Sequence, residues 1–220
     1  MILAPDFAPI THGFGFLELP LDRVESEIAS WSREIARRVR FQRVSQPFPE
    51  SLRNLEPLGA PLFKRLWVET SSARWPTAYF DGWINGGDPF PPISYLAKRM
   101  RCQGLVIIAA PESRQMQLYG PHQTDWLNQE WAVSASKDGR WHFHHRGQTQ
   151  WFEETAEYEN RRIGDRFTQA MLIRYASALE VPLALEQYKP SAVLESPHIP
   201  AGDWRFETLA QARERFARSK

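Results

Sequence analysis

The sequence has only one cysteine, Cys102, among its 220 residues. One cysteine cannot form a disulfide within the chain, and disulfides are typical of proteins that fold in oxidising compartments. No stretch approaches the ~18 consecutive apolar residues that span a bilayer, and the first residues show no basic segment followed by an apolar run. These absences predict a cytoplasmic protein that neither is secreted nor inserts into a membrane.

The chain also lacks an excess of either charge. Its 27 Lys and Arg residues are balanced by 26 Asp and Glu residues, which gives a formal net charge of +1. General nucleic-acid binding and attachment to anionic membranes usually require a strong positive field. We therefore expect neither a nucleic acid nor a membrane as a partner.

Aromatic residues, in contrast, are plentiful. The chain has 9 Trp, 13 Phe and 6 Tyr residues, and 42% of its residues are hydrophobic. This composition is enough to build a sizeable core, and the length fits one main domain. No segment repeats with a period of 20 to 50 residues, which argues against solenoids and propellers.

The clearest helical pattern lies near the N-terminus. Asp22 and Glu25 have the spacing of a capping box, and apolar residues follow at steps of three and four. These residues are Val24, Ile28, Trp31, Ile35 and Val39. Basic residues near the predicted C-terminal end of this helix can interact with the negative end of its dipole, so they need no ligand. They are Arg33, Arg37, Arg38 and Arg40.

Strand-like runs occupy much of the rest of the chain. The run 105–110 is entirely apolar, which predicts a central strand buried on both faces. Asp138-Gly139 between two alternating runs predicts a tight hairpin. The predicted strands are 13–19, 62–70, 77–80, 105–110, 114–119, 130–136 and 140–145.

Four further helices are predicted. The first covers 91–100 with Gly104 as the stop, the second covers 153–162, the third begins after a Thr168 cap, and the fourth covers 206–217. The fold class expected is α+β: a mainly antiparallel sheet covered by helices on one face, in a single domain with a C-terminal helical appendage. We assign residues 1–182 to the domain. Residues 183–220 form an irregular, proline-rich extension whose terminal helix docks on it.

The loop after residue 80 is the first candidate site. It places Trp83 among Asp81, Asn85 and Asp88, an aromatic anchor within an acidic polar rim of the kind found at protein interfaces. A Trp83 side chain folded into the core is an equal alternative. The loop has neither a Walker lysine nor the Gly-x-Gly-x-x-Gly order, so it does not predict a nucleotide site.

The loop 120–128 is the second candidate. His122 and Asp125 have a spacing that allows an oriented general base, and Trp126 and Asn128 follow. The simpler alternative is a turn in which Asp125 binds local backbone amides. No nucleophile accompanies these residues, so covalent catalysis is not predicted.

His142 and His144 alternate on a strand and could share a metal. A metal site also needs further ligands, and we favour a solvated strand face instead. We predict neither a metal nor a cofactor.

Several short segments, taken together, resemble a family of uncharacterised bacterial proteins. They are 77–82, 93–96, 118–121, 124–128, 138–141 and 166–168. The resemblance implies a bacterial origin and a shared α+β domain, but it implies no activity. Small bacterial proteins of this kind are similar to immunity or antitoxin proteins, which block a toxin by binding it.

These observations favour a protein-interaction module, with another protein as its partner and the loops 81–88 and 120–128 as its surface. An alternative is a small-molecule-binding protein or hydrolase whose pocket gathers His122, Asp125 and Asp81. A third interpretation is a homo-oligomer subunit, which would require the exposed aromatics to form one apolar patch.

Overall fold

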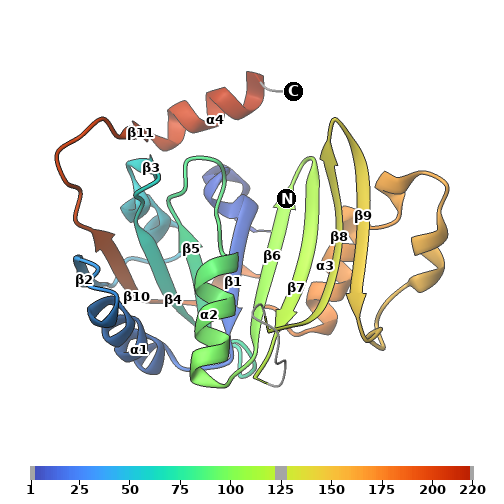
Figure 1. The fold of residues 1–220 in the computed structure, drawn as a ribbon, viewed down its shortest axis with the longest axis horizontal. Helices are drawn as coiled ribbons and strands as arrows, with labels where there is room; N and C mark the ends of the chain where they lie inside the picture. Colours follow the sequence, from blue (N-terminus) through green and yellow to red (C-terminus); the bar gives the residue numbers. More distant parts are fainter. Residues whose placement is uncertain (1–2, 122–127, 219–220) are drawn as a thin grey trace.

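The computed structural model describes residues 3–121 and 128–218. Within these residues, nine strands form one antiparallel sheet in the order β2-β10-β4-β5-β1-β6-β7-β8-β9 (Figure 1). The strands are β1 Gly13–Leu17, β2 Val39–Val44, β4 Arg65–Thr70, β5 Thr77–Asp81, β6 Gly104–Ala110, β7 Ser113–Tyr119, β8 Gln129–Asp138, β9 Arg140–Gly147 and β10 Tyr188–Pro197. The predicted α+β class with a mainly antiparallel sheet is confirmed.

Four α-helices and a small second sheet complete the described part of the chain. The helices are α1 Leu21–Glu34, α2 Phe90–Met100, α3 Gln169–Ala178 and α4 Leu209–Arg218, and the second sheet pairs β3 Leu58–Ala60 with β11 Arg205–Glu207. Short 3-10 helices lie at Pro5–Phe7, Ile10–His12, Glu50–Leu55, Thr155–Glu159, Ile163–Asp165 and Leu185–Gln187.

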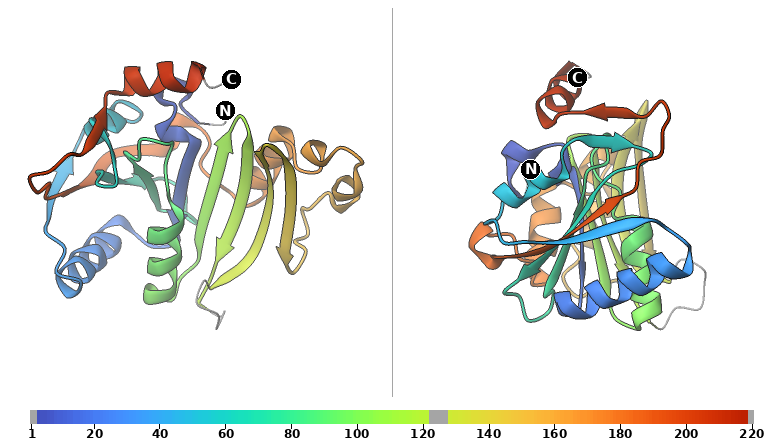
Figure 2. Two further views of the ribbon diagram at one scale, coloured as in Figure 1. Left: turned by 45° about the horizontal axis from the view of Figure 1, so that its top comes forward. Right: turned by 90° about the vertical axis from the view of Figure 1, so that its left-hand side faces the viewer.

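The helices cover both faces of the large sheet, so the expectation that they would cover only one face was wrong. Helices α1 and α2 pack over β4, β10, β1 and β6, with α2 seated close to the strands (Figure 2). Gly15 and Gly104 permit this approach, since a Cβ on Gly15 would lie only 2.5 Å from Ile93 of α2. This face buries Val24, Ile28, Ile93, Leu96 and Val106.

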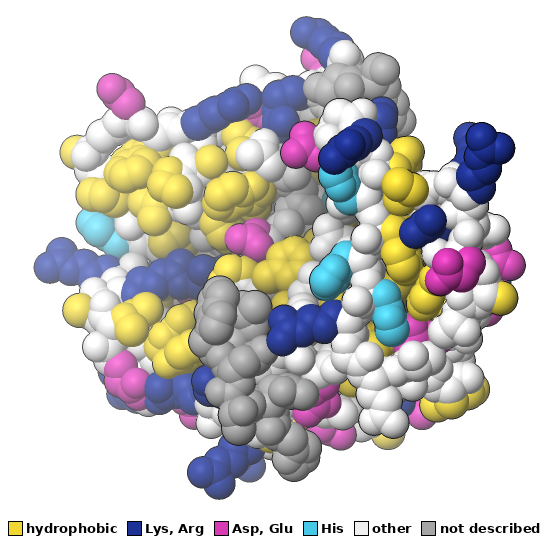
Figure 3. All heavy atoms as spheres, turned by 45° about the vertical axis from the view of Figure 1, so that its right-hand side comes forward, with side chains coloured by type: hydrophobic (Ala, Val, Ile, Leu, Met, Phe, Trp, Pro, Cys, Tyr) yellow, Lys and Arg dark blue, Asp and Glu magenta, His cyan; other side chains and the backbone are white. Residues whose placement is uncertain are grey.

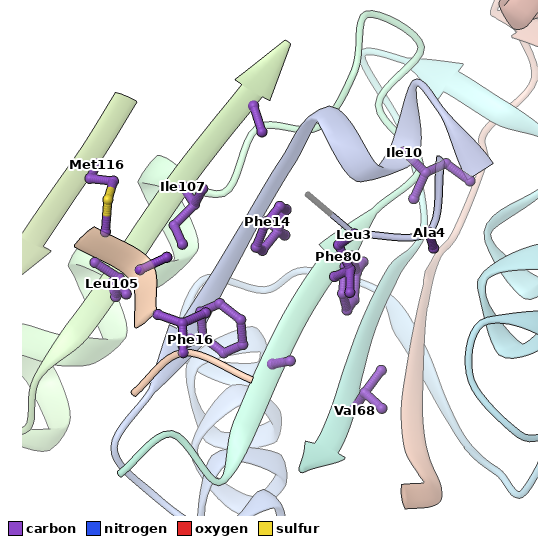
Figure 4. Close-up of a cluster of buried hydrophobic side chains, with 14 of the residues drawn as sticks. Leu3, Ala4, Ile10, Phe14, Phe16, Val68, Phe80, Leu105, Ile107 and Met116 are labelled. Atoms are coloured by element: carbon purple, nitrogen blue, oxygen red, sulfur yellow. The ribbon is translucent and has the colours of Figure 1, made fainter. Parts of the chain in front are cut away.

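The opposite face carries the larger hydrophobic core. Side chains from β1, β4, β5, β6 and β7 gather there with residues of the N-terminal segment, as Figure 4 shows for Phe14, Phe80 and Ile107. Helix α3 closes this core with Met171, Leu172 and Tyr175. Alternate residues of β6 enter the two cores, which confirms the prediction of a strand buried on both faces.

Local signals in the sequence placed several elements correctly. The β8–β9 hairpin turns at Asp138 and Gly139, where Gly139 has a φ of 66°. Thr168 caps α3, because its hydroxyl accepts a hydrogen bond from the Met171 amide. Helix α2 is confirmed, although Arg101 in the left-handed conformation ends it, and Gly104 instead begins β6.

The first helix is shorter than predicted. It ends at Glu34, Ile35 is 52% exposed, and Val39 begins β2. Asp22 is not a cap but lies inside the helix, where its carboxylate accepts a 2.6 Å hydrogen bond from Arg43 of β2. The segment 153–162, predicted to be helical, forms only one short 3-10 turn.

The C-terminal part contains a strand that the sequence analysis missed. Strand β10 lies inside the large sheet between β2 and β4, so the boundary drawn at residue 182 separates this strand from its sheet. Helix α4 does dock on the domain, with Leu209 and Ala212 buried and Phe216 against His12 at a centroid distance of 5.4 Å. None of the helices in the described ranges is long and apolar enough to cross a membrane.

Candidate functional site

Asp81, at the end of β5, holds the loop 82–89 in place. Its two carboxylate oxygens accept 2.9 Å hydrogen bonds, one from the Trp83 amide and one from the Asp88 amide. The side chain is completely buried, and burial raises its pKa to about 6, although the two amides act in the opposite direction. Asp81 therefore shapes the loop from inside and cannot belong to the acidic surface rim that was predicted.

A buried ionic cluster lies beside Asp81. Strand register places Arg65 opposite Asp81, and Glu195 of β10 lies next in the same row. One oxygen of Glu195 accepts hydrogen bonds from Arg37 at 2.7 Å and from Arg65 at 3.0 Å. Arg37 was predicted to lie near the C-terminal end of a helix, which was wrong because the helix ends at Glu34. Glu195 lay in the segment taken as irregular, so nothing indicated this cluster.

Trp83 lies at the surface and packs edge-on against Phe63, with the ring centroids 5.2 Å apart. With it, side chains from β10, β11 and the segments that follow β3 and β10 form what we call the apolar patch: Leu62, Phe63, Trp83, Pro197, Ile199 and Phe206. Most of them line a shallow hollow of about 40 Å³. Ile199 is 45% exposed and Phe206 is 36% exposed. Hydrophobic side chains gather in this way at the upper left of Figure 3, with Lys and Arg side chains beside them.

The other residues of this loop have different positions. Asn85 is exposed, and its side-chain oxygen lies 3.5 Å from a guanidinium nitrogen of Arg215 on α4. Asp88 is partly buried at the start of α2, and burial raises its pKa. Of the four predicted residues in the loop, only Trp83 contributes to the apolar patch.

A second hollow, which we call the basic groove, adjoins the apolar patch. It has a volume of about 500 Å³ and is lined by Arg37, Arg38, Val39, Arg40, Ser196, Pro197 and His198. Ser196 and Pro197 line both hollows, so the two surfaces are continuous. The sequence signal for this groove was the run of arginines after residue 36, which had been attributed to a helix dipole.

The second predicted loop is only partly described. His122, Asp125 and Trp126 lie outside the described residues. Asn128 is buried with a φ of 42°, and its amide group donates to the carbonyl oxygen of Gly120 at 3.3 Å.

The described ends of this loop lie far from Asp81. Across the sheet, Tyr119 is in register with Gly104, Leu17 and Thr77. Thr77 precedes Asp81 by four residues of β5, which is about 13 Å along a strand. Gly120 and Asp81 therefore lie toward opposite ends of the sheet. The pocket of His122, Asp125 and Asp81 stays a prediction, because His122 and Asp125 lie outside the described residues.

The histidines of β9 lie on different faces. His142 and His144 are exposed on the side opposite α3, and the described residues contain no group of three His, Cys, Asp or Glu side chains that could hold a metal. His145 lies on the α3 side, where its Nε2 atom is 3.0 Å from the buried carboxylate of Glu153.

Glu153, predicted to begin a helix over 153–162, instead lies outside any helix with its side chain buried. It accepts hydrogen bonds from the Trp131 indole at 2.9 Å and from the Tyr158 hydroxyl at 2.7 Å. Burial, and then the bond to Glu153, raises the pKa of Tyr158. This cluster joins β8, β9 and the following segment within the core.

Comparison of the chain with protein-family models, with curated proteins and with solved structures finds no match.

Proposed function

We propose that this chain is a protein-interaction module and that its contact surface is the apolar patch together with the basic groove. The observation that carries the proposal is a cluster of partly exposed aromatic and aliphatic side chains bordered by arginines. Trp, Phe and Arg side chains are enriched at protein interfaces, and exposed apolar clusters with polar rims mark such sites. In this proposal Trp83 keeps its predicted role as an aromatic anchor at an interface, but its neighbours are the apolar side chains of the patch and not an acidic rim.

The chemistry of the two hollows defines the partner. The apolar lining of the first hollow favours contact with an aliphatic or aromatic side chain of the partner. In the groove, Arg38 and Arg40 have no carboxylate within ion-pair distance among the described residues, whereas the nearby carboxylate of Glu195 is already paired. A protein segment that presents an apolar side chain beside Asp or Glu residues complements both hollows. The aliphatic and aromatic lining favours a protein over a nucleic acid, whose interfaces consist mainly of phosphate contacts.

The patch is formed by backbone that is already fixed. Asp81 holds the loop that carries Trp83, and the pairing of Phe206 in β11 with Gly59 in β3 fixes a second part of the patch. A surface that is ordered before binding loses less conformational entropy on association. We therefore expect binding with little change in the backbone of the chain.

An immunity-type role, in which the partner is a bacterial toxin that the chain inhibits, is the specific form of this proposal. It rests on the resemblance described above and on the fact that inhibition by binding requires only a shaped surface. If it holds, the captured partner will be toxic when produced alone and harmless when produced with this chain.

The test uses a photo-crosslinking residue, p-benzoylphenylalanine, in place of Phe206. A partner crosslinked from this position is identified, purified and titrated calorimetrically against the wild-type chain. Phe206→Ser and Arg38→Glu should each raise the Kd at least tenfold, which corresponds to about 1.4 kcal/mol. The matched control is Trp151, which is 83% exposed and follows β9 at the opposite edge of the sheet.

A Trp151→Ala variant should bind as the wild type does, and a crosslinker at 151 should not capture the same partner. Equal affinity for the wild type and the Phe206→Ser variant would overturn the proposal. A crosslinked dimer of this chain would replace the foreign partner with a second copy and favour the homo-oligomer interpretation. Capture of a nucleic acid would contradict the protein-binding role.

A further inference from the structure

A hollow at the other edge of the sheet concentrates arginines around a tryptophan. It has a volume of about 460 Å³ and is lined by Arg114, Arg140, Trp141, Arg162, Ile163, Gly164 and Asp165. Arg162 directly precedes the 3-10 turn Ile163–Asp165, which packs on β8 and β9, and the other lining residues come from this turn, β7 and β9. The apolar patch lies at β10 and β11, toward the other edge of the large sheet, so the two surfaces are separate.

Trp141 and Arg114 line this hollow and stack on each other. The Arg114 guanidinium carbon lies 4.5 Å from the centroid of the indole. The backbone of Gly164 also packs on the indole, because a Cβ on Gly164 would be 3.1 Å from that ring. Stacking on an aromatic face fixes the plane of a guanidinium and leaves its edge available for hydrogen bonds.

The Arg114 guanidinium, although held by stacking on Trp141, makes few hydrogen bonds. Its Nη2 atom donates one long bond of 3.3 Å to the Gly164 carbonyl oxygen, and its buried Nε has no hydrogen-bond partner in the described part of the chain. No described carboxylate lies within 4 Å of it. A guanidinium has five donors, and leaving them unpaired at a partly buried site is unfavourable.

The charge in the hollow is positive. Three guanidinium groups face a single carboxylate, that of Asp165, and this carboxylate lies 3.6 Å from Arg162. Clustered arginines bind phosphate-type oxyanions through paired N–H donors, a geometry that a lysine cannot reproduce.

We propose that this hollow is a binding site for a phosphate-type oxyanion, held by Arg114 with Arg140 and Arg162. The stacked guanidinium supplies the directed donors, and the two exposed arginines add charge at the rim. The inference is independent of the proposed function, because it concerns residues at the opposite edge of the sheet.

The test is calorimetric titration of the full chain with inorganic phosphate and pyrophosphate at constant ionic strength, with citrate as the carboxylate probe. Saturable binding of phosphate or pyrophosphate is expected, and Arg114→Ala should raise the Kd at least tenfold. Arg140→Gln, which changes an exposed side chain, should weaken binding less. Asp165→Asn should tighten binding, because among the described residues that line the hollow Asp165 alone carries a carboxylate.

The matched control is Arg161→Gln, because Arg161 is exposed on the same segment but does not line the hollow. This variant should bind as the wild type does. No saturable binding by the wild type, or equal affinity in the wild type and the folded Arg140→Gln and Arg114→Ala variants, would overturn the site. Tighter binding of citrate than of pyrophosphate would overturn the assigned ligand class.

Discussion

The buried carboxylate of Asp81 predicts an unusual dependence of stability on pH. Burial raises its pKa from 3.8 to about 6 in the folded chain. A raised folded-state pKa means that protonation favours the folded chain, so the contribution of Asp81 to stability is full below pH 3.8 and is lost as the pH rises through 6. Asp81→Asn removes this titration while keeping the size of the side chain.

The magnitude follows from the shift. A pKa shift of about two units changes the unfolding free energy by about 3 kcal/mol in total. The wild-type chain loses about 2 kcal/mol of this stability between pH 4 and pH 7. No discount for solvent is needed, because the side chain is completely buried. In Asp81→Asn, the side-chain NH₂ group replaces one of the two oxygens that accept hydrogen bonds from backbone amides. The loss of that hydrogen bond lowers the unfolding free energy by the same amount at every pH. Relative to the wild type, the variant should nevertheless gain about 2 kcal/mol in unfolding free energy between pH 4 and pH 7.

The assay is urea denaturation followed by tryptophan fluorescence at pH 4, 5, 6 and 7. Carboxylates with lowered pKa, such as Glu69 and Glu154, titrate in both proteins and cancel in the difference. Asp138→Asn serves as the control, since Asp138 is exposed and Asn-Gly suits the same hairpin turn. The reasoning is refuted if the difference in unfolding free energy between wild type and Asp81→Asn stays constant from pH 4 to pH 7, or if it shifts in favour of the wild type as the pH rises.

Three further substitutions test other parts of the fold by the same denaturation assay. Glu195→Ala removes the carboxylate that accepts hydrogen bonds from Arg37 and Arg65 and should cost about 3–5 kcal/mol, and a loss below 1 kcal/mol would mean that water or Asp81 takes its place. Gly15→Ala forces α2 away from β1 and should cost about 1–3 kcal/mol, whereas no loss would show that Ile93 can move aside. Trp75→Phe removes a 2.7 Å bond to the Leu179 carbonyl oxygen and should cost about 1–2 kcal/mol, with an unchanged midpoint as the contrary result.

Elements with strong local signals were predictable from the sequence. The hairpin at Asp138-Gly139 needs a positive φ that its glycine supplies, and the α3 cap needs only Thr168 and the amide three residues later. The end of α1 was not predictable in this way. Ile35 and Val39 continue the helical spacing, but Ile35 is exposed and Val39 lies in a strand, because pairing with β10 competes with further helix.

Strand β10 was missed because its sequence conflicts with its position. It contains Pro190 and the acidic Glu195, and neither residue is expected inside a sheet. Glu195 is tolerated only because Arg37 and Arg65 reach it from other parts of the chain. Most of the apolar patch was also missed, because it depends on contacts between distant segments. Trp83 was predicted, but Phe63, Ile199 and Phe206 join the patch only through pairing between segments far apart in the sequence.

The position of β10 also sets the order in which the chain can fold during synthesis. Strand β2 has no neighbour in the sheet other than β10, and β4 needs β10 to complete its second side. Ribosomes make proteins from the N-terminus, so both strands emerge long before residue 188 and leave backbone donors and acceptors without partners. We expect nascent chains to hold this edge open, accessible to chaperones and prone to pairing with other chains, until residues 188–197 have left the ribosome and β10 can pair.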